Sequence, residues 1–245
     1  ELDGFKITFI ADIQADRFTD ENRITNFVNK VNFTQPDLVL IAGDIITTTP
    51  RFIELSSELL GRIRSRYGTF SCVGDHDNWA FRTDFKKSKE EIRSALERNN
   101  ISMIDNGNQK IRINDAEILI SFITNTYVDR PNNDVLEILM DSLNNYSVKI
   151  LVSHQPSKSL IDSAATNNYD LFLSGHTHGG QITFLFPFYN LSPTLFETKY
   201  VRGDFWFGDL LVIVNRGLGM SLAPIRYNST PEVTLITLQK KYLVY

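Results

Sequence analysis

Hydrophobic residues along the chain follow two patterns, short unbroken runs and longer stretches with helical spacing. Unbroken runs are typical of strands buried on both faces. The first three predicted strands are Phe5–Ala11, Leu38–Ala42 and Thr69–Val73. Apolar residues recur at helical spacing within Asp20–Phe33, which predicts a helix with one buried face. Thr49 and Pro50 predict the start of a second helix, which continues through Arg66 and is closed by Gly68.

The rest of the chain continues this alternation. Three further helices are predicted at Ser88–Arg98, Asp134–Asn145 and Ser157–Asn167. Further strands are predicted at Val148–Val152, Asp170–Leu173, Gln181–Phe186, Leu210–Val214 and Glu232–Leu238. Asn114 and Asp115 predict the turn of a hairpin between Lys110–Ile113 and Glu117–Phe122. Strands that alternate with helices predict an α/β fold, and because no repeat or linker interrupts them, we expect one domain over residues 1–245.

Composition narrows the classes of function. The 245 residues are 42% hydrophobic and 22% charged, which is ordinary for a globular chain with a substantial core. The net charge of -4 argues against general nucleic-acid binding, because phosphate backbones attract basic surfaces. The single cysteine, Cys72, lies in an apolar run, so we expect a buried structural thiol and no internal disulfide.

Two features of the chain bear on membrane association. No run of about 18 apolar residues is present, so the sequence predicts no membrane-spanning helix. The chain begins at Glu1 and reaches a strand pattern within a few residues, without the regions of a signal peptide. We therefore expect a processed form that has lost an upstream segment, and such a segment is a candidate membrane attachment.

Polar turns follow five of the buried strands, and most of them contain glycine. The turns are Asp12-Ile13-Gln14, Gly43-Asp44, Gly74-Asp75-His76-Asp77, Ser153-His154 and Gly175-His176-Thr177-His178. All four histidines of the chain lie in these turns. Because the carboxyl ends of neighbouring parallel strands meet at one crevice, we expect these side chains to converge.

The residue types in these turns suit divalent cations. His176 and His178 are two residues apart, so on extended backbone both side chains point to the same face. Asp44 follows a buried strand, where a carboxylate is costly unless it is paired or bound to a cation. Each residue alone has an ordinary explanation as a hydrogen-bonded or helix-capping group. Together they indicate a cation site, and mixed oxygen and nitrogen ligands suit Mn, Fe, Zn or Mg.

The order of these motifs resembles that of the calcineurin-like metallophosphoesterases. The pattern of that family is Asp-x-His, Gly-Asp, Gly-Asn-His-Asp, a lone His and Gly-His-x-His, and it is matched from residue 5 to about residue 180. The later segments Asn215–Gly219, Pro224–Arg226 and Pro231–Leu235 resemble a bacterial membrane-associated subgroup that includes UDP-diacylglucosamine hydrolases.

The resemblance implies two packed mixed β-sheets flanked by helices, and a site with two divalent cations. Asp44 matches the residue that bridges both cations. The other implied ligands are Asp12, Gln14 and His178 for one cation, and Asp75, His154 and His176 for the other. A hydroxide at the cations would attack phosphorus in line. His76 would stabilise the transition state or protonate the leaving oxygen, and Asp77 would orient it.

Three positions depart from the family pattern. Gln14 replaces a histidine, Asp75 replaces an asparagine, and Thr47 replaces a commonly acidic residue. The ligand set thereby loses a nitrogen and gains an anionic oxygen, so we expect Mn²⁺ or Mg²⁺ to be favoured over Zn²⁺ or Fe. Because His76, Asp77 and Asp44 are retained, an active enzyme is favoured over a non-catalytic metal-binding scaffold of the same fold.

The resemblance implies a phosphoester or pyrophosphate substrate, and the class of that substrate stays open. Aromatic residues are dense in Phe184–Tyr189 and Phe205–Phe207, which fits either a buried cluster or an apolar rim that touches lipid. Subgroup analogy favours a lipid- or nucleotide-linked substrate with peripheral membrane contact, and a broad-specificity phosphodiesterase is the alternative. Arg82 and Arg216 are candidate substrate contacts, as is Arg226. The sequence leaves the oligomeric state and the compartment open.

Overall fold

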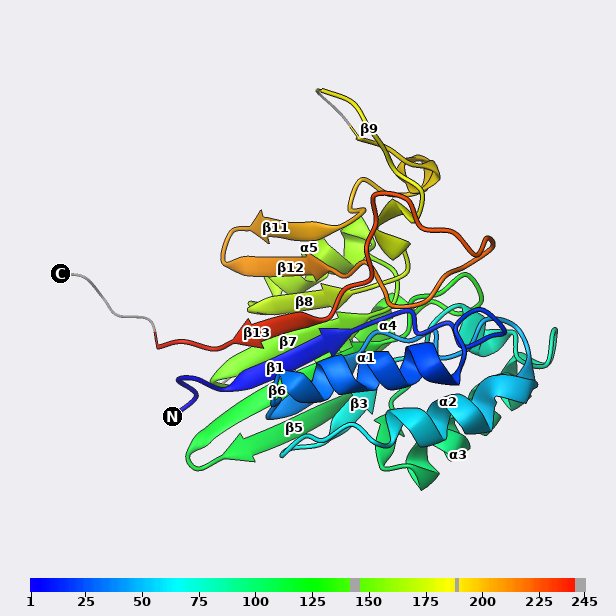
Figure 1. The fold of residues 1–245 in the computed structure, drawn as a ribbon. Helices are drawn as coiled ribbons and strands as arrows, with labels where there is room; N and C mark the ends of the chain where they lie inside the picture. The colour runs from blue at the N-terminus through cyan, green and yellow to red at the C-terminus, as the bar shows by residue number, and fades with distance from the viewer. Residues whose placement is uncertain (142–145, 188–189, 241–245) are drawn as a thin grey trace.

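Two β-sheets pack face to face in the computed structural model, which describes residues 1–141, 146–187 and 190–240 (Figure 1). The first sheet has the order β13 (Thr234–Thr237), β1 (Lys6–Ile10), β2 (Leu38–Ile41), β3 (Thr69–Ser71) and β4 (Ile101–Met103). Its strands β1 to β4 run parallel, and β13 pairs with β1 in the antiparallel direction.

The second sheet has six strands. Their order is β11 (Gly203–Phe207), β12 (Leu210–Val214), β8 (Leu171–Ser174), β7 (Val148–Ser153), β6 (Ala116–Ile123) and β5 (Gly107–Ile113). The four central strands are parallel, and each outer strand forms an antiparallel hairpin with its neighbour. The predicted turn at Asn114 and Asp115 is confirmed, and Asn114 takes a positive φ of 55° there. Both sheets are mixed, as expected.

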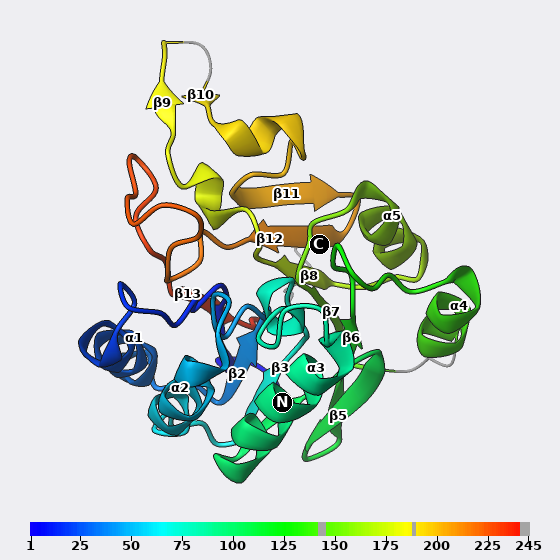
Figure 2. The same ribbon diagram turned by 90° about the vertical axis from the view of Figure 1, so that its right-hand side faces the viewer.

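Helices cover the outer face of each sheet (Figure 2). The helices α1 (Glu21–Phe33), α2 (Ile53–Leu60) and α3 (Phe85–Arg98) cover the first sheet, and α4 (Asn133–Asp141) and α5 (Lys158–Thr166) cover the second. Side chains of Asp20, Asp84 and Ser157 accept a backbone N–H at the starts of α1, α3 and α5. Each such cap stabilises its helix by about 1 kcal/mol. The described residues also include short 3-10 turns, namely η1 (Pro50–Phe52), η2 (His76–Asn78), η3 (His178–Gly180) and η4 (Pro193–Phe196).

The space between the sheets is filled by apolar side chains that are shielded from solvent. Phe9 and Leu40 of the first sheet meet Phe122 and Val152 of the second, and all four have no exposed surface. Cys72 is buried in the same cluster, as predicted. Fully burying one such side chain contributes about 1.5–3 kcal/mol, so this layer holds the two sheets in a fixed relation.

Two predicted elements are much longer than those observed. The second helix ends at Leu60 and not at Arg66, because the Asn32 side chain binds the carbonyl of Arg62 and the N–H of Arg64, which gives that backbone partners outside a helix. The strand predicted at Gln181–Phe186 is reduced to β9 (Phe184–Leu185), which pairs with β10 (Asn190–Leu191). The end of the predicted helix Asp134–Asn145 and the residues 188–189 of the aromatic run lie outside the described residues.

The hairpin of β9 and β10 stands away from the two sheets (Figures 1 and 2). Within the described part of the chain, no helix is both long enough and apolar enough to span a membrane.

Candidate metal centre

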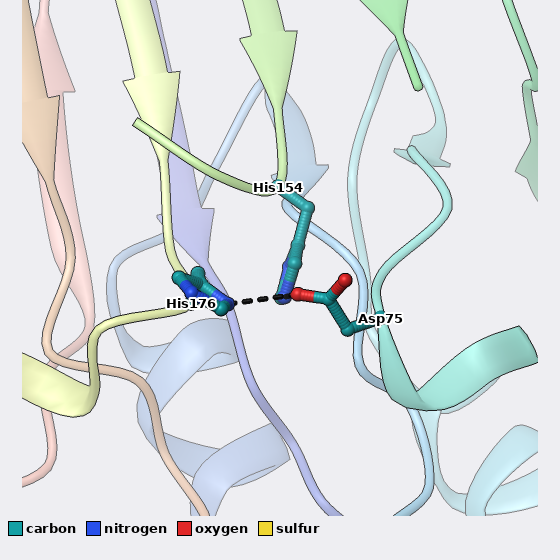
Figure 3. Close-up of side chains that lie close together, drawn as sticks. All are labelled: Asp75, His154 and His176. Atoms are coloured by element: carbon teal, nitrogen blue, oxygen red, sulfur yellow. Dashed lines mark ion pairs between the residues drawn. The ribbon is translucent and has the colours of Figure 1, made fainter. Parts of the chain in front are cut away.

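The predicted site residues come from strand ends in both sheets. Asp12, Asp44 and Asp75 follow the parallel strands β1, β2 and β3, whereas His154 and His176 follow β7 and β8. Because the two sheets pack with these ends at one edge, side chains from distant parts of the sequence meet there (Figure 3).

The backbone at this edge has a conformation that residues other than glycine rarely adopt. Five expected ligands have positive φ: Asp12 at 51°, Gln14 at 50°, Asp44 at 55°, His176 at 71° and His178 at 50°. Each such residue costs about 1–2 kcal/mol relative to an ordinary conformation. Strain of this kind is typical of functional sites, where the surrounding structure holds it in place.

Gly74 shows how closely the loops approach each other. A Cβ atom at this position would lie 2.2 Å from the Asp44 nitrogen and 2.3 Å from its Oδ1. Any larger residue at position 74 would push the β2 and β3 loops apart, so glycine is required for Asp44 and Asp75 to share one site.

Asp75, His154 and His176 form one tight group. The Asp75 Oδ2 atom lies 2.8 Å from His176 Nδ1 and 3.2 Å from His154 Nε2, and the facing atoms of all three residues lie within 4.8 Å of one another (Figure 3). The Nδ1 of His154 is 2.6 Å from the Ala42 carbonyl, which only accepts, so this nitrogen carries the proton. In the neutral form of the ring, the lone pair is on Nε2 and faces the carboxylates of Asp44 and Asp75.

Asp12, Asp44 and His154 form a second group that shares His154 with the first. His154 Nε2 lies 3.4 Å from Asp44 Oδ2, and Gln14 Nε2 donates to the same oxygen at 2.6 Å. His178 Nε2 is 3.8 Å from Asp12 Oδ1, so it lies beside this group and is not within the tight cluster.

The donor atoms fit divalent cations. Among the described residues, Gln14 Oε1 and His154 Nε2 are buried polar atoms without a hydrogen-bond partner. Such atoms are costly unless a ligand satisfies them. Carboxylate oxygens, an amide oxygen and imidazole nitrogens that face one another are a suitable set for Mn²⁺, Mg²⁺, Fe or Zn²⁺.

Burial and neighbouring charges shift the pKa values of the site residues in different directions. Burial raises the pKa of Asp12 to about 6, against the influence of the His154 charge. Burial also opposes ionisation of Asp75, but the imidazoles of His154 and His176 hold its pKa well below its usual range. Burial and the charge of Arg226 lower the pKa of His178 to about 3, so this imidazole is neutral at pH 7.

The contacts described for Asp77 and His76 do not include the expected pairing of their side chains. The Asp77 carboxylate accepts the backbone N–H groups of Gly74, Asp44 and Ile45 at 2.8, 3.0 and 2.8 Å, so both of its oxygens are used to tie two loops together. His76 Nδ1 instead contacts the Thr47 carbonyl, and His76 Nε2 lies 3.3 Å from Ser221 Oγ.

Two of the predicted arginine contacts, Arg82 and Arg216, do not line the pocket at the site. A pocket of about 420 Å³ opens over Asp44, Asp75, His76, His176 and His178, and neither Arg82 nor Arg216 is among its lining residues. Arg82 is exposed, and Arg216 pairs with Glu232 at 3.3 Å.

Arg226 has a structural role. Its guanidinium donates to the carbonyls of Gly219, Arg216, Ser229 and His178, which holds the 216–229 loop against the His178 turn.

Several pocket residues lie outside the sequence motifs, and four of them carry aromatic or polar side chains that face the site residues. They are Trp79, Tyr127, Glu197 and Ser221. Trp79 and Tyr127 lie with nearly parallel rings, at 12° and 6.5 Å between centroids. Trp79 could have been found, because it follows the His76 turn by three residues. The other three lie in loops with no local motif, so only the fold brings them to the pocket.

Comparisons with known proteins agree with this geometry. The model of the calcineurin-like phosphoesterase family matches residues 5–180. A Bacillus subtilis protein described as the uncharacterized metallophosphoesterase YkuE is 32% identical over 97% of this chain and 80% of its own length. A Campylobacter jejuni protein, the uncharacterized metallophosphoesterase Cj0846, is 30% identical over 96% of this chain and 59% of its own length. A Caenorhabditis elegans protein, the putative metallophosphoesterase F40B5.2, is 27% identical over 95% of this chain and 48% of its own length.

The chain thus spans most of the first relative but less than two thirds of the other two. Among solved structures, the Thermus thermophilus protein TT1561 has a TM-score of 0.58 at 13% identity, covering 87% of this chain and 90% of that protein. That likeness shows a shared fold.

Proposed function

The chain belongs to the calcineurin-like phosphoesterase family, and we propose that it hydrolyses phosphoester or pyrophosphate bonds with two divalent cations. The observation that carries this proposal is the pair of adjoining groups Asp75–His154–His176 and Asp12–Asp44–His154 at one edge of both sheets. We assign Asp44 to the position between the cations and Gln14 and His178 to the outer side of the Asp12 group. We further propose that residues 1–245 form one domain, since β13 near the end of the chain pairs with β1 near its start.

Two divalent cations held by these groups would supply an activated water at neutral pH and would neutralise charge on the phosphoryl oxygens. We assign proton transfer to His76. Its Nδ1–H donates to the Thr47 carbonyl, which fixes the ring and leaves Nε2 toward the pocket. When the ring is protonated, Nε2–H can donate to the leaving oxygen of a substrate. Asp77 supports the site indirectly, because it holds the backbone on which Asp44 stands.

We propose Mn²⁺ as the preferred cation, with Mg²⁺ next. The Gln14 amide donates through Nε2 to Asp44, so its Oε1 is the atom left for a cation, and this oxygen is a harder ligand than imidazole. Asp75 adds an anionic oxygen to the other group. Metal analysis after purification tests this preference, and a clear advantage of Zn²⁺ over Mn²⁺ in competition would refute it.

The substrate that we propose carries a lipid or a nucleotide on its phosphate, and the exposed hairpin supports a contact with lipid. Phe184, Leu185 and Phe186 have 52%, 57% and 44% of their surface exposed, and Phe196 has 92% exposed. These residues stand on the segment whose Pro193, Thr194 and Glu197 line the pocket. Exposed apolar clusters of this kind mark surfaces that contact a membrane or another protein.

A chromogenic phosphodiester assay tests the activity. Protein loaded with Mn²⁺ should hydrolyse the ester, whereas protein stripped by chelation and the His76→Ala variant should not. Inactivity of the wild type with every cation would favour the alternative, a metal-binding scaffold of the same fold. Equal rates on plain and lipid-linked esters would instead favour a broad-specificity phosphodiesterase.

A further inference from the structure

Glu197 contacts the side of His176 that faces away from the Asp75 group. Its Oε1 lies 2.7 Å from His176 Nε2, while His176 Nδ1 lies 2.8 Å from Asp75 Oδ2. We propose that Glu197 is a positioning residue that orients His176 as a cation ligand, an inference that rests on the proposed metal-dependent function. Glu197 does not itself belong to either group of candidate ligands.

The chemistry of imidazole gives this contact its consequence. Only one nitrogen of a neutral imidazole carries a proton, and a carboxylate at Nε2 keeps the proton there. With its proton on the Glu197 side, the neutral ring would offer the Nδ1 lone pair to a cation held beside Asp75. Histidine ligands of metal ions usually donate their other N–H to a carboxylate or carbonyl in this way, and loss of that partner typically weakens the metal affinity about 10- to 100-fold.

Tyr127 holds the Glu197 carboxylate in place. Its hydroxyl donates to Glu197 Oε1 and lies 3.3 Å from His176 Nε2, and its backbone N–H donates to Asp75 Oδ1 at 2.6 Å. Tyr127 therefore connects Glu197 to the Asp75 side of the same group. His176 is bounded on one face by the Tyr127 ring, with 5.4 Å between the centroids at 69°.

The position of Glu197 in the fold links the site to η4, which follows the β9–β10 hairpin. Glu197 follows η4 directly, and its N–H donates to the Thr194 carbonyl at 3.0 Å. Thr194 Oγ1 lies 3.5 Å from the carbonyl of Thr177, the residue between the two histidines. The exposed Leu195 and Phe196 are thus followed directly by Glu197, whose carboxylate contacts His176 of the candidate metal centre.

Calorimetric titration with Mn²⁺ tests the role of Glu197 in the full chain. Glu197→Gln keeps the shape of the side chain but removes its charge, and about 40% of the side chain is exposed, so the fold should tolerate the change. We expect one of two binding steps to weaken about 10- to 100-fold and the other to stay unchanged. Tyr127→Phe, which leaves the carboxylate but removes its hydroxyl partner, should weaken the same step less.

The control is Glu54→Gln, which removes a carboxylate paired with Arg98 at 2.5 Å on the outer helices. It should leave both binding steps unchanged. Thermal unfolding of all variants with chelator present reports their folding independently of the cation. Two Mn²⁺ ions bound equally well by wild type and Glu197→Gln would overturn the inference while leaving the proposed function intact. A wild type that binds no divalent cation would overturn both.

Discussion

Gly217 offers a sharp test of how the fold places Asp12. This glycine has a φ of +67°, and a Cβ atom on it would lie 2.7 Å from Asp12 Cβ and 2.8 Å from Asp12 Oδ2. Real Cβ atoms do not approach other atoms so closely, so Gly217→Ala must displace the Asp12 side chain or the 216–219 loop. We expect this variant to lose stability and divalent-cation binding together.

The magnitude follows from two separate costs. Holding a residue other than glycine at positive φ costs about 1–2 kcal/mol. Overpacking a close-packed site by one methyl group costs a further ~1–3 kcal/mol. The free energy of unfolding of Gly217→Ala should therefore fall by roughly 2–5 kcal/mol, of which only the second part reflects contact with Asp12.

Gly208→Ala is the matched control, because it separates these two costs. Gly208 has a φ of +64°, and a Cβ atom there meets nothing within 4 Å. Urea unfolding with chelator present should show a loss of about 1–2 kcal/mol for this control and a larger loss for Gly217→Ala. Mn²⁺ titration should show wild-type affinity for the control and weakened binding for Gly217→Ala. Equal stability and equal affinity of the two variants would refute the idea that packing against Gly217 sets the position of Asp12.

Four further predictions concern His76, the buried acids and the exposed Phe196. His76→Ala should lower kcat about 100- to 10,000-fold and leave Mn²⁺ affinity unchanged, and a lost affinity in calorimetry would contradict its assignment to proton transfer. Mn²⁺ affinity should fall as the pH drops below about 6. Burial raises the pKa of Asp12 to about 6, so below this pH the carboxylate takes up a proton that competes with the cation. An affinity that does not change with pH in calorimetry would contradict this. Without cations the sign reverses for stability, because burial raises the pKa of both Asp12 and Asp77 to about 6 from 3.8, so their contribution is present below pH 3.8 and lost as the pH rises through 6. His178, whose pKa is lowered to about 3, acts in the opposite direction, but it is one group against two. Thermal unfolding with chelator should therefore show lower stability at pH 6 than at pH 4. Phe196→Ser should weaken binding to phospholipid vesicles in a sedimentation assay by the roughly 1.5–3 kcal/mol of one buried phenyl ring, and unchanged binding would count against membrane contact through Phe196 of η4.

The sequence pattern was sufficient for the α/β class and for the loops that carry the chemistry, and the family resemblance added the two-sheet architecture. Buried strands such as Leu38–Ala42 are continuous apolar runs, and the polar turns after them stand out because a carboxylate at a buried strand end needs a partner. Element ends were harder to predict. The helix after Pro50 stops at Leu60 because Asn32, a residue on another helix, supplies hydrogen bonds that the local pattern does not reveal.

The partners of the site residues also depend on tertiary structure. Asp77 follows His76 directly, so the sequence suggests that the two side chains pair. In the fold, three backbone N–H groups from two loops reach the Asp77 carboxylate first. Glu197 lies 21 residues after His176 in a segment without a recognisable motif, and only the packing of η4 on η3 brings it to that imidazole.

A crystal of the protein grown with Mn²⁺ tests the central claim most directly, because anomalous scattering locates and identifies each cation. We predict two peaks, one among Asp75, His154 and His176 and one beside Asp12 and Asp44, with Gln14 Oε1 facing the second. A map without a peak at either group, from protein that is folded and fully loaded, would contradict the assignment of this strand-end cluster as the metal centre.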